Sequence, residues 1–94
     1  MTDQKNITQS DIDNKAKEFK SNIPYALSSR HEFLKNNYKI LYRKKNPVYL
    51  DLILINDCIN NSLDYRAPEC IDFSIDTICF YLALDYYKIS DIDW

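Results

Sequence analysis

The sequence contains no glycine, and this absence excludes several classes of structure at once. Tight hairpin turns of types I′ and II′ need residues at positive φ, a role that Gly or Asn-Gly normally fills. Phosphate-binding loops need glycine so that the backbone can approach the ligand closely. A helix needs neither feature, because Asn can take the left-handed position after its last turn. The composition therefore favours helices over hairpin-rich sheets and nucleotide-binding loops.

Cysteines and long apolar runs are also scarce. The three cysteines, Cys58, Cys70 and Cys79, form no C-x-x-C pair, and no apolar segment typical of an export signal follows Met1. We therefore expect a reduced, cytoplasmic protein. The longest apolar stretch, 48–55, is interrupted by Asp51 and is shorter than the about 20 residues that a membrane span requires. We expect no membrane insertion.

The 94 residues suffice for one domain, since chains usually use about 100 to 200 residues for each. Residues 1–9 are polar apart from Ile7, so we expect a frayed N-terminal segment there. A single helical domain should occupy residues 10–94.

Apolar periodicity predicts four helices, and with them an all-α fold in the form of a compact bundle. The expected helices span 11–20, 30–45, 47–60 and about 70 or 74 to 88. The third is apolar almost all round, so we place it at the centre of the fold. Strands over 48–55 and 70–76 are the competing interpretation, because short β-branched runs resemble buried helix.

Capping signals support these boundaries. Ser10 is a candidate N-cap for the first helix, and Ser29 with Glu32 forms a capping box for the second. Asn46-Pro47 reads as an N-cap followed by proline at the first helical position, where its missing N–H is not needed. Asn60-Asn61 is the expected end of the third helix.

The net charge of −2 conceals a division along the chain. Residues 1–48 hold ten Lys/Arg against five Asp/Glu, whereas residues 49–94 hold two against nine. Two interpretations follow. Either the two halves attract each other in the folded protein, or the acidic half binds a basic partner.

Aromatic side chains lie among the carboxylates of the acidic half. Tyr and Trp are enriched in binding hot spots, and carboxylates can stand where phosphates would bind. We therefore expect a surface that binds a basic protein, formed by Asp64, Tyr65, Glu69, Asp72, Asp76, Asp85, Tyr87, Asp91, Asp93 and Trp94. The opposing interpretation, that the aromatics belong to the core, applies to Tyr81 and Tyr86.

A basic ridge on the second helix indicates nucleic-acid binding as an alternative. Lys35, Lys39 and Arg43 fall at i, i+4 and i+8, and Lys44 and Lys45 extend the ridge. Such a ridge can follow phosphates, although the net acidic charge of the chain opposes it.

Residues suited to catalysis or metal binding are few. His31 is the only histidine, and a Cys-His nucleophile would also need an oxyanion hole and an orienting group, which usually sit on glycine-bearing turns. The spacing of His31 and the cysteines matches no zinc site. We expect buried, unreactive cysteines, no enzyme, no cofactor and no metal.

Small size, acidic helices and the lack of a catalytic set suggest a protein-binding inhibitor. By analogy of composition with immunity proteins, antitoxins and anti-defence factors, we expect a non-catalytic factor that blocks a basic, nucleic-acid-handling enzyme such as a toxin nuclease. One alternative is a helical nucleic-acid-binding regulator. Another is a homo-oligomeric scaffold that buries surplus apolar surface of the third and fourth helices between subunits.

Overall fold

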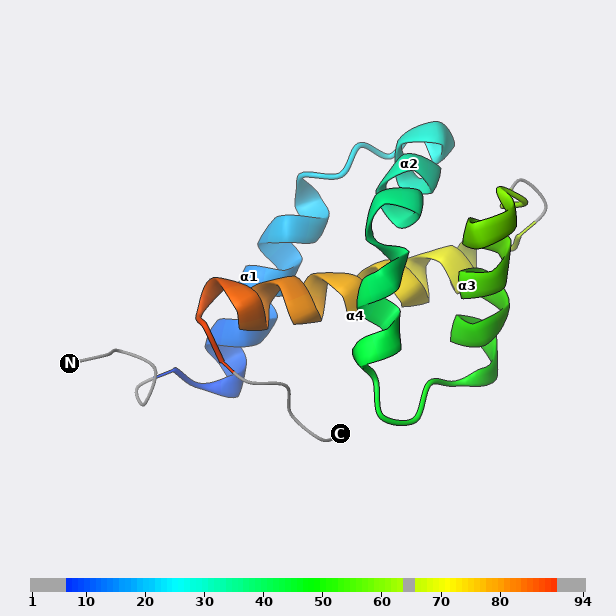
Figure 1. Cartoon of the computed structure of the whole chain (residues 1–94). Coiled ribbons are helices and arrows are strands. Elements are labelled where there is room, and N and C mark those ends of the chain that lie inside the picture. The colour runs from blue at the N-terminus through cyan, green and yellow to red at the C-terminus, as the bar shows by residue number, and fades with distance from the viewer. Residues whose placement is uncertain (1–6, 64–65, 90–94) are drawn as a thin grey trace.

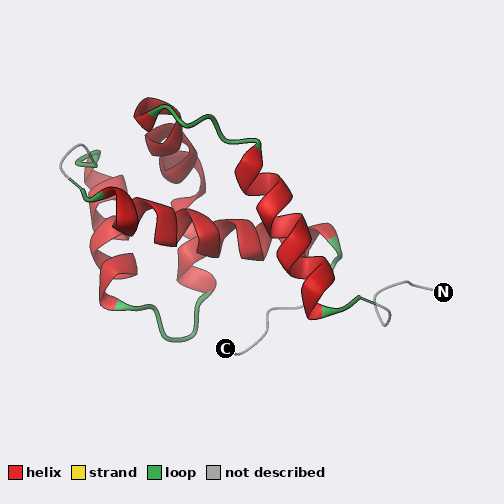
Figure 2. Cartoon of the chain, turned by 180° about the vertical axis from the view of Figure 1, so that it is seen from behind, coloured by secondary structure: helices red, strands yellow, loops and turns green. Residues whose placement is uncertain are grey.

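The computed structural model describes residues 7–63 and 66–89 and is built from helices (Figure 1). The elements are α1 (Gln9–Ser21), α2 (Leu27–Asn37), the 3-10 helix η2 (Tyr38–Arg43), α3 (Tyr49–Asn60) and α4 (Pro68–Tyr86). No strand occurs in the described ranges, as the view from behind also shows (Figure 2). The expected all-α class is therefore confirmed, and the strand alternatives over 48–55 and 70–76 are wrong.

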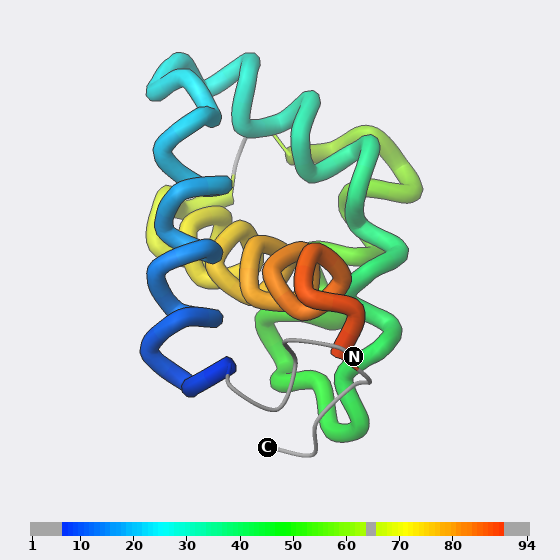
Figure 3. Tube along the Cα trace, turned by 90° about the vertical axis from the view of Figure 1, so that its left-hand side faces the viewer, coloured from blue at the N-terminus to red at the C-terminus, as the bar shows by residue number. Residues whose placement is uncertain are grey.

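The centre of the fold is α4. It runs through the molecule with α1 on one side and the segment from η2 to α3 on the other, an arrangement seen most clearly along its axis (Figure 3). Ile71, Ile75 and Ile78 face the larger apolar cluster, while Tyr81 and Leu84 belong to a second cluster shared with α1. The prediction that the third helix forms the centre is wrong, because α4 is longer and is covered on more sides.

The first helix begins two residues before the expected position. The hydroxyl of Thr8 accepts from the backbone N–H of Asp11 (3.2 Å), and the Asp11 carboxylate accepts from the N–H of Thr8 (3.0 Å). This is a capping box in place of the predicted cap at Ser10. Apolar packing favours the cap at Thr8: Ile7 precedes this cap and packs in the same cluster as Ile12, as in a hydrophobic staple.

The second predicted helix is two elements. Its N-cap is Ala26, which makes no side-chain cap, so the predicted capping box at Ser29 does not start the helix. At the other end, the Asn37 side chain donates to the carbonyl of Phe33 (2.8 Å), and the Asn37 backbone leaves the α region (φ −127°). Local side-chain bonding of this kind competes with the helix, and the chain continues as η2.

Helix ends are formed without glycine, as expected. Asn61 takes the left-handed conformation (φ 58°, ψ 39°), and the N–H of Ser62 reaches back to the carbonyl of Asp57 (2.8 Å). Lys88 does the same after α4 (φ 59°), where the N–H of Ile89 reaches the carbonyl of Leu84 (2.9 Å). The choice of Asn61 was predictable, whereas Lys88 is an unusual residue for this conformation.

Proline takes the first helical position in α4, not in α3. Pro68 begins α4 after Ala67, so the helix starts two residues before residue 70, the earlier of its two expected starts. The N-cap of α3 is Val48, two residues beyond the predicted cap at Asn46. The chain before α3 is extended at Lys44 (ψ 132°), because that side chain turns inward.

A buried carboxylate holds three segments together. Asp51 of α3 is fully buried (0 % exposed) and accepts from the ammonium of Lys44 (Nζ to Oδ2, 3.0 Å). Its other oxygen accepts from the hydroxyl of Ser74 on α4 (3.2 Å). A buried carboxylate is tolerated only with such partners. The position of α3 against α4 is thus fixed by charge as well as by apolar packing.

Removal of the Lys44 charge should therefore destabilise the protein. We expect Lys44→Met to lower the free energy of unfolding by about 3 to 5 kcal/mol, since Asp51 would be left buried and uncompensated. The double variant Lys44→Met, Asp51→Leu should recover much of that loss. Urea denaturation followed by circular dichroism measures both, and Lys35→Met, at an exposed lysine, is the control, with an expected change within about 0.5 kcal/mol. A small effect of Lys44→Met would show that water reaches Asp51.

Candidate protein-interaction site

Half of the predicted acidic surface lies outside the described residues: Asp64, Tyr65, Asp91, Asp93 and Trp94. The other half, Glu69, Asp72, Asp76, Asp85 and Tyr87, lies on or directly after α4. At about 100° per residue, Glu69, Asp72 and Asp76 fall along one edge of α4, which we call the acidic edge, whereas Asp85 lies on the opposite side of the helix. The described half of the predicted surface is therefore not one patch.

Three of these carboxylates form ion pairs with cations from the first half of the chain. The pairs join α4 to α1, α2 and η2: Lys20 with Asp76 (2.7 Å), Arg30 with Asp72, and Arg43 with Asp85 (3.0 Å). The attraction expected between the basic and acidic halves is therefore present within the molecule. The electrostatic field that Asp72, Asp76 and Asp85 would present to a partner is weakened accordingly.

These pairs remain open to exchange. The side chains of Asp72, Asp76 and Asp85 are 41 %, 58 % and 52 % exposed. Ion pairs with this much solvent contact stabilise by about 0 to 1 kcal/mol, since water screens the attraction and the side chains lose entropy. A basic partner could therefore displace the internal cations at little cost.

The tyrosines of α4 divide between core and surface. Tyr81 is buried, as predicted. Tyr86, expected in the core, is exposed; its ring packs edge-on against Phe19 (centroids 6.3 Å apart) beneath the ammonium of Lys15 (4.1 Å). Tyr87 is half-buried against the cluster shared with α1. Of the aromatic residues in the predicted surface, Tyr87 alone lies within the described residues, and it packs internally.

The basic residues expected on one ridge are dispersed. Lys35 lies on α2 and Lys39 on η2, whose three residues per turn break the i, i+4, i+8 spacing. Arg43 and Lys44 are held in ion pairs within the chain, and Lys45 follows in the turn before α3. No continuous track for phosphates results from this set.

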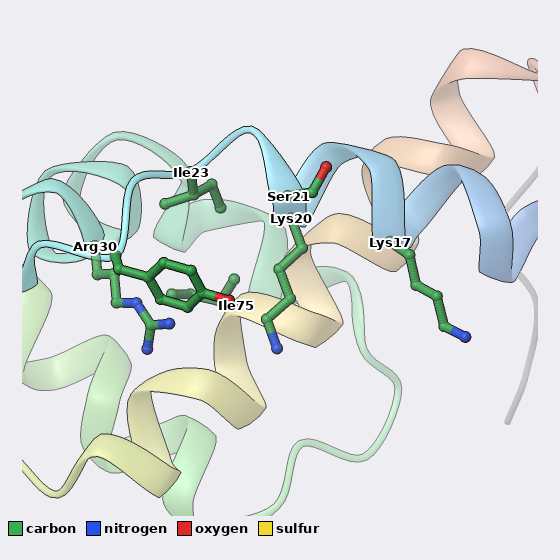
Figure 4. A pocket seen from close by; sticks show the side chains of 7 residues that line it. Lys17, Lys20, Ser21, Ile23, Arg30 and Ile75 are labelled. Carbon is green, nitrogen blue, oxygen red and sulfur yellow. The ribbon is translucent and has the colours of Figure 1, made fainter.

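A pocket of about 260 Å³ lies between the end of α1, the start of α2 and α4 (Figure 4). Lys20 and Arg30 extend toward α4, which contributes Ile75 to the pocket, whereas Lys17 points away from it. The two inward cations are the ones paired with carboxylates of α4. Because its charge is largely compensated, the pocket indicates no particular class of ligand.

The outer face of α3 is the most distinctive surface. Tyr49, Leu52 and Ile59 are 75 %, 50 % and 52 % exposed. At about 100° per residue they fall on one side of the helix, together with half-buried Ile53 and exposed Asn56 and Asn60. We refer to these six residues as the α3 face. It carries no charge.

The charged residues of α3 lie on its buried side. Asp51 and Asp57 are the only charged residues of this helix, and both are buried. Lys44 compensates the first and Arg66 the second. The helix thus buries both of its charges together with Leu54, Ile55 and Cys58 and leaves other apolar residues exposed, whereas an ordinary surface helix turns its charges outward.

The leading interpretation of the sequence missed this surface because it placed the third helix at the centre of the fold, while the oligomer alternative expected surplus apolar surface on that helix without locating it. One signal was available. The acids at Asp51 and Asp57 flank Leu54 and Cys58 on the helix, and no other charge occurs between residues 49 and 60. If the side of the helix that carries these two acids is buried, the exposed side of the helix has no charged residue. The usual assumption that charges face solvent gives the reverse orientation.

The cysteines are placed as packing residues. Burial raises the pKa of Cys58 and of Cys79 to about 11, which is the opposite of what a nucleophilic thiol requires. Both side chains lie in the larger apolar cluster, and Cys70 is half-buried at the start of α4. Within residues 7–63 and 66–89, no group of three or more His, Cys, Asp or Glu side chains is placed to hold a metal ion.

Comparisons with known proteins provide no relative: no protein-family model, no curated protein and no solved structure matches this chain. Among the described helices, none is both long and apolar enough to cross a lipid bilayer. What the chain does has to be inferred from its own surfaces.

The raised thiol pKa values give a direct test of the packing. At pH 8 a thiol with a pKa near 11 has about a hundredfold less thiolate than one near 9. We expect Ellman's reagent to modify one thiol of the folded protein rapidly, Cys70, and all three in guanidinium chloride. Rapid reaction of Cys58 or Cys79 in the folded protein, located by mass spectrometry, would contradict the placement of these side chains in the core.

Proposed function

We propose that this chain is a non-catalytic protein-binding factor whose contact surface is centred on the α3 face. The observation that carries this proposal is the distribution of residues on α3: both charges are buried and compensated, while Tyr49, Leu52 and Ile59 are exposed. Burial of a Leu or Ile side chain stabilises by about 1.5 to 3 kcal/mol. A group of such residues exposed on the surface is typical of a site that a binding partner covers.

The chemistry of the α3 face suits a protein partner. Tyrosine and the aliphatic side chains supply apolar contact, and the amides of Asn56 and Asn60 supply both donors and acceptors. A phosphate-rich partner would find no cation on this face. The partner surface should therefore be apolar at its centre and uncharged.

Affinity capture from native cells tests this proposal. We expect Leu52→Gln and Ile59→Gln to reduce recovery of the partner at least about tenfold, as is typical of truncated hot-spot residues. Leu27→Gln is the matched control, because Leu27 on α2 is exposed to the same extent as Leu52, at 50 % each. Circular dichroism should show all three variants folded. Equal recovery with the α3 variants, or equal loss with the control, would contradict the proposal.

A second candidate is inhibition of a basic, nucleic-acid-handling enzyme by the acidic edge of α4, in the manner of immunity or anti-defence proteins. The half-exposed carboxylates of Asp72 and Asp76 favour it, since their internal pairs are weak enough to be exchanged for cations of a partner. In this mechanism the carboxylates occupy the positions of substrate phosphates.

Neutralisation of that edge separates the two candidates. If carboxylates drive binding, Asp72→Asn with Asp76→Asn should weaken capture at low salt, and the wild type should lose affinity as salt rises. Asp13→Asn with Glu18→Gln, which neutralises two exposed acids of α1, is the control. Unchanged capture by the α4 variant at low salt would remove the acidic-edge mechanism and leave the α3 face as the contact surface.

A further inference from the structure

Every helix other than α3 presents charge to solvent. Exposed charged side chains occur on α1 (Lys17), α2 (Glu32), η2 (Lys39) and α4 (Glu69). The exposed residues of α3 are all uncharged. A face without charge is the kind of surface that can meet an identical face, because a two-fold axis places each residue near the axis opposite its own copy.

The centre of the α3 face is Asn56. At about 100° per residue it falls between Leu52 and Ile59 on one side and Ile53 and Asn60 on the other. An amide has both a donor and an acceptor, so two Asn side chains can hydrogen-bond to each other across an axis. A carboxylate or an ammonium in this place would repel its own copy. A single Asn in an apolar helix interface also fixes the register of the two helices.

From this self-compatibility we propose that the occupant of the α3 face is a second copy of the same chain. The chain forms a two-fold symmetric dimer in which α3 packs against α3 with Asn56 beside the axis. This inference rests on the proposed binding role of the α3 face and names its partner.

The dimer is expected to be weak. A helix of 12 residues is about 18 Å long, and one such helix on each side gives an interface at the small end of those that form specifically. Its stability should depend little on ionic strength, because no charged group of α3 lies in the contact. These two properties set the conditions of the test.

Sedimentation equilibrium of the whole chain, in the presence of a reductant, measures the association. Between about 1 and about 500 µM, the range in which small interfaces assemble, the mass should rise from 11.2 kDa toward twice that value. The rise should persist in 1 M NaCl, where charge-driven association is screened within about 3 Å. A monomer throughout this range would overturn the proposal.

Charge variants at Asn56 locate the interface. Asn56→Asp and Asn56→Lys should each weaken self-association at least about tenfold, since like charges would meet at the axis. Mixed in equal amounts, they should associate again, because the two charges are then opposite. Asn14→Asp, at an exposed position on α1, makes the same change of charge away from the interface and should leave the dimer intact.

The outcomes separate this inference from the proposed function. A dimer that neither Asn56 variant weakens would place the interface elsewhere and overturn the proposal, as would failure of the mixed variants to associate. A monomeric wild type whose capture of another protein still depends on Leu52 would leave the proposed function standing without self-association. A monomer whose capture is indifferent to Leu52 would refute both.

Discussion

The fully buried carboxylate of Asp51 is the constraint on which the arrangement of the third and fourth helices depends. An isolated buried charge is strongly unfavourable, and the ammonium of Lys44, in the turn between η2 and α3, supplies the compensating charge. The bond from Ser74 sets the rotation of α4 against it. With Asp51 facing inward, the other side of α3 carries Tyr49, Leu52 and Ile59, and these side chains are exposed.

Long-range ion pairs use much of the charge division along the chain. The carboxylates of α4 receive cations from three earlier elements, so opposite charges separated by many residues meet in the folded molecule. Each pair is half-exposed and contributes little stability alone. Their common effect is to favour one assembly of the helices, because a different placement of α1, α2 or η2 would set these charges against other neighbours. The charge asymmetry along the sequence suggested an external basic partner, but several of the acidic residues pair with basic residues of the same chain.

The surface that remains after this pairing has a different character from the one expected. Its most prominent feature is apolar and uncharged, with Tyr49, Leu52 and Ile59 exposed beside two asparagine amides. Proteins rarely leave such residues grouped in water unless something covers them. Burial raises the pKa of Cys58 and Cys79, and the pocket beside α1 and α4 is lined by Lys20 and Arg30, which are paired with carboxylates. These features agree with the proposed role in association.

The sequence by itself determined the helical class, because a chain without glycine has few routes to hairpins, and it determined the end of α3, because Asn61 is the residue there best suited to a left-handed cap. It did not determine where α1 and α2 begin, since competing caps differ by only about 1 kcal/mol and apolar contacts decide between them. Only the tertiary structure decided which side of α3 faces solvent. A helix that is apolar on nearly all sides has no periodicity from which its orientation can be read. The orientation depends instead on the partners of its acids, and these can be distant in sequence: Ser74 lies 23 residues from Asp51 along the chain.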